Sequence, residues 1–272
     1  MTRRAAEEAF DVLVSPTETL GPTEFAFELP DGWQQGRGLF GGLIIGCLIR
    51  AMERVVADPE RSLRSLTAEL CGPTQPGPMT VKVEVLRAGN AVSTLAARVL
   101  QSGEVQAHAV GVFGKARSDT RQRVDLAPLA LPDWRAVEAA ALAPPVGPDF
   151  SKYFEFRPVS GLPYSGEAAP RTACFVKPLR PGTARDAAWV VACADTCWPG
   201  VLVIDEAPRP MATITFSLEF IAPMTGLDPE APLFHRATTV SIRDGYAVEL
   251  RELWGADGRL VALNQQTFVI IR

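Results

Sequence analysis

The chain has 272 residues, enough to bury a large core in one or two domains. Its net charge of −4 leaves no basic surface for nucleic acid, and 47% hydrophobic and 21% charged residues are ordinary for a globular protein. The longest apolar run, residues 39–49, is shorter than the roughly 18–20 residues of a membrane span. Residues 1–14 lack the apolar core of a signal peptide, so we expect a cytoplasmic protein with no membrane span.

Five cysteines and two histidines limit the metal chemistry open to the chain. Cys193 and Cys197 are four residues apart, but a zinc site needs a denser cluster of ligands than His108 and His235 can complete. We therefore expect buried free thiols in a reducing compartment, with no metal and no cofactor.

The first elements are a short helix, a strand and a long buried helix. Residues 3–12 favour the short helix, and residues 23–30 alternate polar and apolar side chains as a strand does. Residues 43–56 start with apolar side chains on nearly every side, which indicates a helix buried against a sheet. Gly41 and Gly42, just before this helix, let its start approach neighbouring backbone closely.

Four strands and a linker follow this helix. Pro-Gly, Ala-Gly-Asn and Ser-Gly turn signals separate the strands. The predicted strands are 63–71, 79–87, 91–101 and 104–114. Residues 115–148 are rich in Arg, Pro and Ala, and we interpret them as a linker with one short helix over residues 130–142.

The rest of the chain predicts a second set of the same elements. Residues 185–198 form the second buried helix. The predicted strands are 153–159, 173–179, 211–221, 233–242, 246–255 and 259–271. Each half therefore has a leading strand, one buried helix and a four-stranded antiparallel meander.

The two halves also share sequence signatures. LRAGNAV at residues 86–92 matches IRDGYAV at residues 242–248, and AELCGP at residues 68–73 resembles LEFIAP at residues 218–223. A long helix wrapped by a curved antiparallel sheet is the hotdog arrangement, so the repeat predicts an α+β double hotdog. The alternative is an α+β domain with unrelated hairpins, because similar turns also arise by chance.

The two copies are not chemically equal. We place an N-terminal hotdog unit at residues 1–114, a linker at 115–148 and a C-terminal hotdog unit at 149–272. The second helix carries Asp195 in the run VVACADTCW, where the first helix has Ile49. A carboxylate among Val, Ala, Cys and Trp is costly unless it is hydrogen-bonded or paired.

Two further polar residues in the second copy correspond to an apolar residue and a glycine in the first copy. Thr213 corresponds to Leu63, and Gln266 corresponds to Gly111. Strand alternation places Asn264 on the same face as Gln266. This asymmetry predicts one active site per chain, in the C-terminal unit.

Each candidate residue also has a structural explanation. Asp195 could cap a helix or pair with a cation, because buried ion pairs exist outside active sites. Thr213 could be an ordinary strand threonine, and Gln266 a solvent-facing residue near the C-terminus. The placement of all three in one copy favours a catalytic site over these separate explanations.

The chain resembles the TesB-like acyl-CoA thioesterase II family of double-hotdog thioesterases. The resemblance covers most of residues 23–272 and is patchy in the linker. The matching pieces are Phe40-Gly41-Gly42, Leu86-Arg87-Ala88-Gly89-Asn90, Ala194-Asp195, Ala212-Thr213-Ile214 and the run from Asp257-Gly258-Arg259-Leu260-Val261-Ala262 to Gln266 and Arg272.

The resemblance implies a mechanism and a substrate. In that family an Asp, a Thr and a Gln hold the nucleophilic water, and these roles fall on Asp195, Thr213 and Gln266. Amides at Gly41 and Gly42 would bind the substrate and form an oxyanion hole at the helix start. The substrate would be acyl-CoA, and the chain would form a homodimer or larger homo-oligomer.

The chain also departs from the family pattern. The family places Asp two residues after the Thr, where this chain has Thr215, and its Gln-Glu-Gly is here Gln266-Thr267-Phe268. One alternative is therefore a non-catalytic protein that binds acyl thioesters. Another is a hotdog dehydratase, but His108 and His235 lie in predicted strands and not on a buried helix, where that chemistry generally needs one. The acyl chain, and the choice between CoA and carrier-protein thioesters, stay open.

Overall fold

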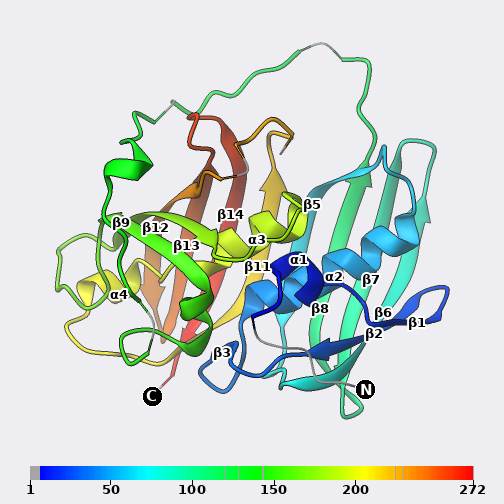
Figure 1. The fold of residues 1–272 in the computed structure, drawn as a ribbon, viewed down its shortest axis with the longest axis horizontal. Helices are drawn as coiled ribbons and strands as arrows, with labels where there is room; N and C mark the ends of the chain where they lie inside the picture. Colours follow the sequence, from blue (N-terminus) through cyan, green and yellow to red (C-terminus); the bar gives the residue numbers. More distant parts are fainter. Residues whose placement is uncertain are drawn as a thin grey trace.

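The computed structural model describes residues 7–119, 121–127, 129–142, 144–223, 225–228 and 230–271. Within these residues, one antiparallel sheet curves around two long helices (Figure 1). The strands of the sheet lie in the order β1-β2-β6-β7-β8-β5-β11-β14-β13-β12-β10-β9. The α+β double hotdog predicted from the repeat is confirmed.

The first half of the sheet and its helix come from the N-terminal part of the chain. Its strands are β1 (Glu18–Gly21), β2 (Glu24–Leu29), β5 (Ser62–Leu70), β6 (Gly77–Ala88), β7 (Val92–Gln101) and β8 (Glu104–Gly114). Its helix is α2 (Gly41–Val56), preceded by the single turn α1 (Phe10–Leu13). A separate two-stranded ribbon pairs β3 (Gln34–Gln35) with β4 (Gly38–Leu39).

The second half repeats this arrangement. Its strands are β9 (Phe154–Ser160), β10 (Arg171–Pro178), β11 (Met211–Phe220), β12 (Leu233–Arg243), β13 (Tyr246–Trp254) and β14 (Leu260–Ile270). Its helices are α3 (Ala187–Thr196) and the short α4 (Val201–Ile204). The segment after β8 arches across the top of the molecule to this half and contains the 3-10 turns η1 (Trp134–Ala136) and η2 (Asp149–Tyr153) (Figure 1).

The two halves meet where β5 pairs with β11, and this seam is symmetric. Thr67 lies opposite Ser217, while Leu66 opposite Leu218 mirrors Ala68 opposite Phe216. The hydrogen-bonded ladder therefore runs unbroken from one half to the other.

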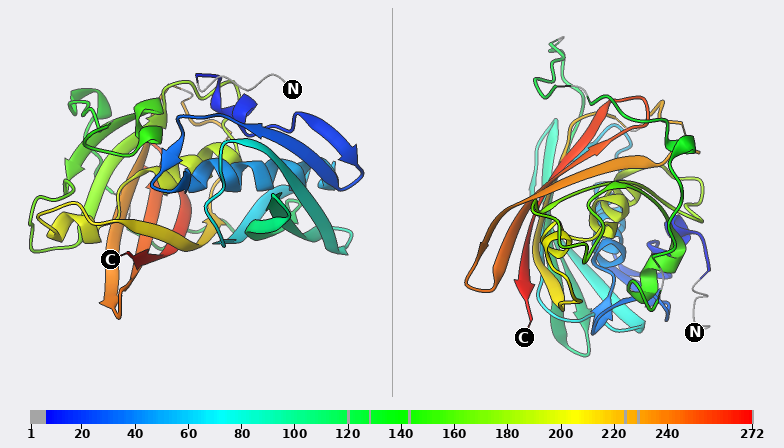
Figure 2. Two further views of the ribbon diagram at one scale, coloured as in Figure 1. Left: turned by 90° about the horizontal axis from the view of Figure 1, so that it is seen from below. Right: turned by 90° about the vertical axis from the view of Figure 1, so that its left-hand side faces the viewer.

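The helices α2 and α3 pack against each other on the concave side of the sheet, enclosed by it in both side views (Figure 2). They run antiparallel, because Gly42 at the start of α2 lies against Ala192, near the end of α3, and Arg50 reaches Asp186 at the start of α3. Apolar side chains of both helices and of the inner sheet faces form one core. This packing brings the start of α2 to the end of α3, where Asp195 lies.

One described stretch, Ala187–Ile204, is long and apolar enough to cross a membrane by length and composition. Residues 197–200 interrupt it between α3 and α4, and 83% of it is buried inside the fold. Both features are those of a core helix in a globular fold.

Several predictions about local structure were wrong. Each half is not a four-stranded meander in chain order, because β5 pairs with β8 and β6 pairs with β2. The helix predicted over residues 3–12 falls partly outside the described residues and is otherwise only the turn α1, and the linker helix over residues 130–142 is only η1. Pro132 interrupts the linker segment, and helices as short as these are marginal unless an apolar face packs against the core.

The matched heptapeptides form different hairpins. In the second copy, Asp244 and Gly245 alone join the strands, with φ angles of 54° and 81°, so the turn uses the left-handed conformations that glycine tolerates. In the first copy, four residues separate the paired Ala88 and Ser93. The similarity of the two heptapeptides therefore does not extend to the geometry of the turn.

Candidate active site

Asp195 lies in the last turn of α3, inside the core. Asp186 caps the start of this helix, since its Oδ1 accepts hydrogen bonds from the amides of Ala188 and Trp189 at 3.1 and 3.3 Å. All ten residues of α3 are buried, and Asp195 is 6% exposed. The helix therefore presents one carboxylate to the interior of the protein.

Gln266 links the other two predicted catalytic residues, Asp195 and Thr213. Its Nε2 donates to Asp195 Oδ1 at 3.2 Å, and its Oε1 accepts from Thr213 Oγ1 at 3.2 Å. Thr213 lies on β11 at a β-bulge, which breaks the regular pairing with β14 between residues 213 and 215. The predicted group of Asp195, Thr213 and Gln266 thus meets in one hydrogen-bonded chain.

Asn264 fixes the orientation of the Gln266 amide. Its Oδ1 accepts the second hydrogen bond from Gln266 Nε2 at 3.1 Å, and its Nδ2 donates to the carbonyl of Ser217 at 2.6 Å. Because a carboxylate and a carbonyl oxygen both face it, the nitrogen of the Gln266 side chain points to Asp195. Sequence alternation placed Asn264 on this face but assigned it no function.

The start of α2 completes the surroundings of Asp195. The side chain of the N-cap residue Phe40 makes no capping hydrogen bond, and the amide of Gly42 instead donates to the Asp195 carboxylate. A Cβ atom at Gly41 would lie 2.7 Å from Asp195 Oδ2, so only glycine leaves the carboxylate in place. The structure therefore places both predicted glycines at the site, with the Gly42 amide already engaged by the carboxylate.

The environment favours a basic carboxylate. Burial raises the pKa of Asp195 above its ordinary value. The positive charge of Arg251, the hydrogen bonds from Gln266 and Gly42, and the His235 ring oppose this rise in pKa without cancelling it. A carboxylate with a raised pKa accepts a proton more readily than an exposed aspartate, which suits a general base.

A buried ion pair that sequence reasoning missed lies beside Asp195. Arg251 Nε contacts Glu249 Oε1 at 2.7 Å, and the two side chains are 1% and 0% exposed. Arg251 Nη1 also donates to the carbonyl of Ala194 at 2.6 Å, while Glu249 Oε2 accepts from the Gly200 amide and the Thr239 hydroxyl at 2.6 and 2.9 Å.

A sequence signal for this pair existed in the alternation of β13. The inward positions of AVELREL carry Glu249 and Arg251 between the buried Ala247 and Leu253, while Leu250 points outward. Charged residues in phase with core residues indicate a buried polar network.

His235 and two cysteines lie in the same region of the core. Burial by itself raises the pKa of Cys197, but the Cys174 hydrogen bond and the charges of His235 and Arg251 outweigh it and lower the pKa to about 5. The cysteines, all of them within the described residues, form no disulfides and four are buried, but Cys71 is exposed, so the expectation of five buried thiols was wrong there. Cys71 directly follows the end of β5, in the connection to β6.

His108 takes no part in this site. It lies on the outer face of β8, between the inward-facing Ala107 and Ala109, and its Nδ1 pairs with Glu69 Oε2 at 3.0 Å. Across the described ranges, no group of three or more His, Cys, Asp or Glu side chains is arranged to hold a metal ion.

The matching position in the first copy is apolar. Strand pairing makes Leu63 the counterpart of Thr213 and Gly111 the counterpart of Gln266, as predicted. A cavity of about 390 Å³ opens beside Leu63, and charged side chains at its rim, among them Glu53, Asp58 and Asp186, line it together with apolar ones. The counterparts of Thr213 and Gln266 themselves carry no polar side chain, so the hydrogen-bonded chain of Asp195, Gln266 and Thr213 has no equivalent in the first copy.

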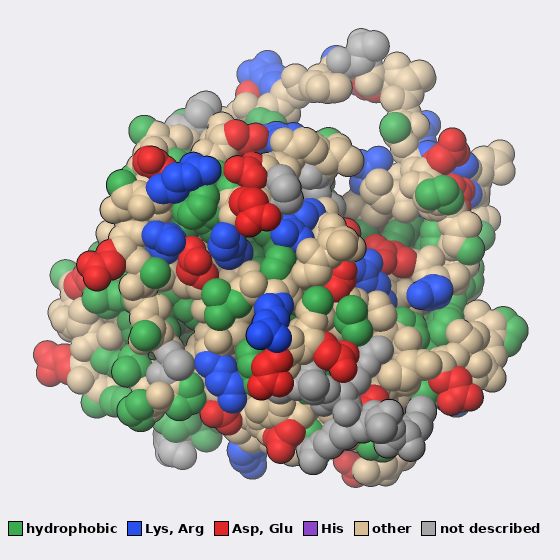
Figure 3. All heavy atoms as spheres, in the orientation of Figure 1, with side chains coloured by type: hydrophobic (Ala, Val, Ile, Leu, Met, Phe, Trp, Pro, Cys, Tyr) green, Lys and Arg blue, Asp and Glu red, His purple; other side chains and the backbone are tan. Residues whose placement is uncertain are grey.

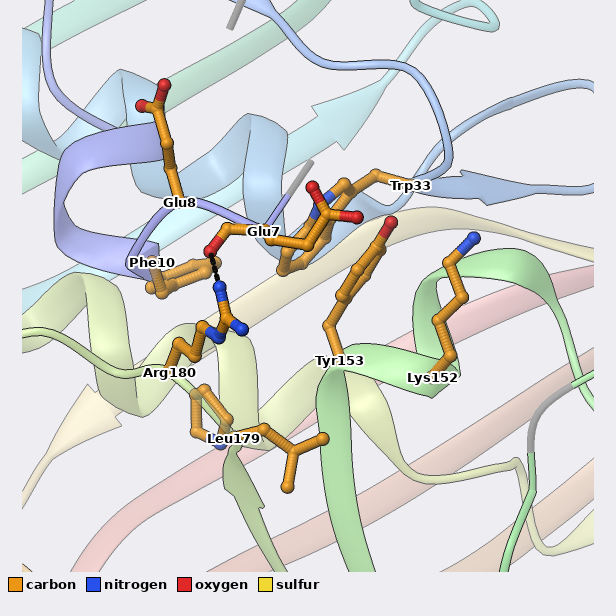
Figure 4. Close-up of a pocket in the computed structure, with 9 residues that line it drawn as sticks. Glu7, Glu8, Phe10, Trp33, Lys152, Tyr153, Leu179 and Arg180 are labelled. Atoms are coloured by element: carbon orange, nitrogen blue, oxygen red, sulfur yellow. Dashed lines mark hydrogen bonds between the residues drawn. The ribbon is translucent and has the colours of Figure 1, made fainter. Parts of the chain in front are cut away.

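A further cavity of about 210 Å³ lies near the N-terminus (Figure 4). Trp33 stacks on Tyr153 with ring centroids 4.6 Å apart, and Arg180 donates to the carbonyl of Glu7 at 2.8 Å. None of the predicted site residues lines this cavity. The face of the molecule seen in Figure 3 carries basic and acidic side chains interspersed, without a field of one sign.

The chain matches two family models, the acyl-CoA thioesterase N-terminal domain over residues 29–114 and the acyl-CoA thioesterase C-terminal domain over residues 124–270. No curated protein sequence matches it. The polar cluster described above lies within the C-terminal match, apart from the two glycines of α2.

Solved structures share the fold. A hotdog-fold protein of unknown function from Alicyclobacillus acidocaldarius has a TM-score of 0.82 at 23% identity, covering 97% of this chain and 98% of that chain. A protein classed as a thioesterase II from Thermobifida fusca has a TM-score of 0.82 at 22% identity, covering 98% and 99%. Acyl-CoA thioesterase II TesB2 from Mycobacterium marinum has a TM-score of 0.71 at 17% identity, covering 97% and 98%. The chain belongs to the acyl-CoA thioesterase family and has the double-hotdog fold of its TesB-like members.

Proposed function

We propose that the protein hydrolyses the thioester of acyl-CoA to a free fatty acid and CoA, with a water molecule held by Asp195, Thr213 and Gln266. The single observation that carries the proposal is the bridge through Gln266, which binds both the buried carboxylate of Asp195 and the hydroxyl of Thr213. The counterparts of these residues in the first copy are Ile49, Leu63 and Gly111, which have no side-chain hydrogen-bonding group to hold a water molecule.

The chemistry starts with proton transfer. Asp195 accepts a proton from the water as its oxygen adds to the thioester carbonyl carbon, which forms a tetrahedral intermediate. Collapse of the intermediate breaks the carbon–sulfur bond, and the proton on Asp195 passes to the departing CoA thiolate. Thr213 and Gln266 hold the water against the carbonyl carbon, and such positioning lowers the barrier by several kcal/mol.

The start of α2 has two tasks in this proposal. The Gly42 amide supports the Asp195 carboxylate directly. The helix dipole and the Gly41 amide would stabilise the negative charge that develops on the thioester oxygen, while the Gly42 amide stays with the carboxylate. Because α2 belongs to the first copy and Asp195 to the second, one site would require both copies.

Release of free thiol from a panel of acyl-CoA esters tests the proposed function. We expect turnover of at least one chain length, with CoA and free acid formed in equal amounts. Absence of turnover for every chain length would contradict the proposal. Measurable binding of acyl-CoA without turnover would instead support a non-catalytic acyl-thioester-binding protein.

We also propose the cellular setting and the organisation of the chain. The family resemblance favours a homodimer or larger homo-oligomer in the cytoplasm, and the chain divides at residues 114 and 149 into two hotdog units and a linker. Light scattering on the purified protein measures the mass of the assembly. Limited proteolysis is expected to cut first within residues 115–148, since exposed connecting segments are cleaved before packed strands.

A further inference from the structure

We infer that the buried pair Glu249–Arg251 is a positioning device for Asp195: it holds the end of α3 in place and supplies the positive charge that balances the Asp195 carboxylate. The inference rests on the proposed function, in which Asp195 is the base. The pair touches α3 through the backbone next to Asp195, since Arg251 Nη1 donates to the carbonyl of Ala194 at 2.6 Å.

The position of this contact explains how it acts. The last four carbonyls of a helix lack partners within the helix, and the C-terminal end of a helix carries partial negative charge. Asp195 lies in the last turn of α3, so both burial and the helix end disfavour its ionised form. A guanidinium that binds the Ala194 carbonyl opposes both effects at once.

The pair is built into the fold and cannot swing away. Arg251 lies opposite Asn264 and Glu249 lies opposite Gln266 in the pairing of β13 with β14. Glu249 is held by the Gly200 amide and by the Thr239 hydroxyl, in addition to Arg251. Both carboxylate oxygens of Glu249, and the Nε and Nη1 atoms of Arg251, therefore have a fixed partner, and Nη1 reaches α3.

The first copy shows that the fold does not need this pair. In the pairing of β7 with β8, Ala97 takes the place of Arg251 and Leu95 the place of Glu249. Apolar residues at such positions are often as stable as a buried ion pair or more so. A costly pair that occurs only in the copy with Asp195 therefore points to a functional need.

The other titratable groups near Asp195 come from β10, β12 and the end of α3. His235 approaches from β12 and Cys197 from the end of α3 itself, with Cys174 of β10 hydrogen-bonded to Cys197. The side chains from β11 and β14 at the site are neutral, and α2 contributes its backbone amide at Gly42. The ionised pair Arg50–Asp186 lies at the opposite end of α3. Arg251 is thus the permanently charged cation beside the carboxylate.

Carbon-13 NMR titration of the aspartate carboxyl groups tests the inference without relying on turnover. The protein is labelled at aspartate Cγ, and Asp195→Asn assigns the Asp195 signal. We compare the natural protein with the doubly neutral variant Glu249→Gln/Arg251→Met, in which the introduced amide oxygen can still accept hydrogen bonds from Gly200 and Thr239. The Asp195 titration is expected to move upward by about 0.5–1 pH unit.

A matched control tests whether the loss of any nearby ion pair moves the titration, and a second variant covers the case in which the double variant does not fold. Glu252→Gln/Arg236→Met removes a different ion pair, between Arg236 of β12 and Glu252 of β13, whose Nη2 and Oε2 atoms are 2.7 Å apart and partly exposed. It should leave the Asp195 titration unchanged. Glu249→Gln alone leaves Arg251 without its counter-charge and is expected to move the titration downward, which keeps the test decisive if the double variant does not fold.

The outcomes separate the two proposals. An Asp195 titration that is the same in the natural protein, in Glu249→Gln and in the double variant would overturn the role of the pair, whatever the activity. A natural protein that hydrolyses no thioester would overturn the proposed function, while the NMR titration would still report whether Arg251 balances Asp195. In an active enzyme, the acidic limb of the pH–rate profile should move with the NMR titration, a change that a purely structural role would not produce.

Discussion

Gln266 Nε2 donates to Asp195 Oδ1 across 3.2 Å, and this bond links the last strand of the sheet to the buried helix α3. The opposite end of the same amide accepts from Thr213. One side chain therefore sets the distance between the proposed base and the hydroxyl that would help to hold the water.

Replacing Gln266 with Glu should abolish most activity with little change in shape. A carboxylate at this position has no N–H to donate to Asp195, and it places a second negative charge beside the first. We expect kcat/KM to fall by about 10²–10³, the usual cost of removing a preorganised donor. Steady-state thiol release measures the loss. A fall of less than about tenfold would show that the amide does not organise the site.

Replacing Thr213 with Val removes the hydroxyl and keeps the shape. We expect kcat to fall by about 10–100-fold, since a water-binding group is lost while Gln266 and Asp195 stay in place. Thr213→Ser should retain most activity, because it keeps the hydroxyl. Thr215→Val, at the exposed position that follows the bulge on the same strand, is the matched control and should leave kcat unchanged. Equal losses in the two valine variants would argue against a special role for Thr213.

Gly41→Ala should displace the Asp195 carboxylate. The added Cβ would lie 2.7 Å from Asp195 Oδ2 and 3.0 Å from Leu70 Cδ1, so the carboxylate must move out of its position. We expect kcat to fall by about 10²-fold, since displacements of about 1 Å cost that much. Gly46→Ala serves as the control, because its Cβ would meet Val14 Cγ1 at 2.8 Å, on the same helix but at an apolar contact. This control should lower stability and leave kcat unchanged once the protein is folded.

The stability of the protein should depend on pH through Asp195. Burial raises the pKa of Asp195 in the folded protein, despite Arg251 and the hydrogen bonds, so folding favours the protonated carboxyl. Below the pKa of Asp195 in the unfolded chain, this group adds no pH dependence to the free energy of unfolding. The free energy of unfolding then decreases as the pH rises from that pKa through the higher pKa of the folded protein. Asp195→Asn lacks this dependence.

Urea unfolding of both proteins between about pH 4.5 and pH 8 measures the difference, with an ordinary aspartate pKa of about 3.9 as the lower reference. The stability of the natural protein relative to Asp195→Asn should decrease with rising pH, by at most about 1.4 kcal/mol per pH unit. A difference that stays constant or grows in favour of the natural protein would contradict the raised pKa.

Much of the fold could be predicted from the sequence, because the two copies reinforce each other. Apolar residues recur with helical spacing around Cys47 and Val190 and with strand alternation in the segments that follow each helix. The predicted bounds of these helices and strands therefore agree with the structure to within about two residues. The order of strands in the sheet was harder, because alternation does not state which strand pairs with which. The seam between Thr67 and Ser217 depends on long-range pairing that no local pattern encodes.

The catalytic candidates were predictable for a different reason. Asp195, Thr213 and Gln266 each break the apolar pattern of the position they occupy, and comparison with the first copy exposed the break. Arg251 and Glu249 break it too, but a charged residue in a strand is usually expected to face solvent. Only the alternation of β13 as far as Leu253 shows that both lie on the buried face. Such violations of local pattern concentrate at functional sites.

The most direct measurement of the central claim is thiol release by Asp195→Asn beside the natural protein, on the acyl-CoA ester that the natural protein hydrolyses best. The proposed mechanism predicts that kcat falls by about 10²–10⁴, the usual contribution of a general base, while circular dichroism and the oligomeric mass stay unchanged. Comparable turnover by the folded variant would contradict the assignment of Asp195 as the base.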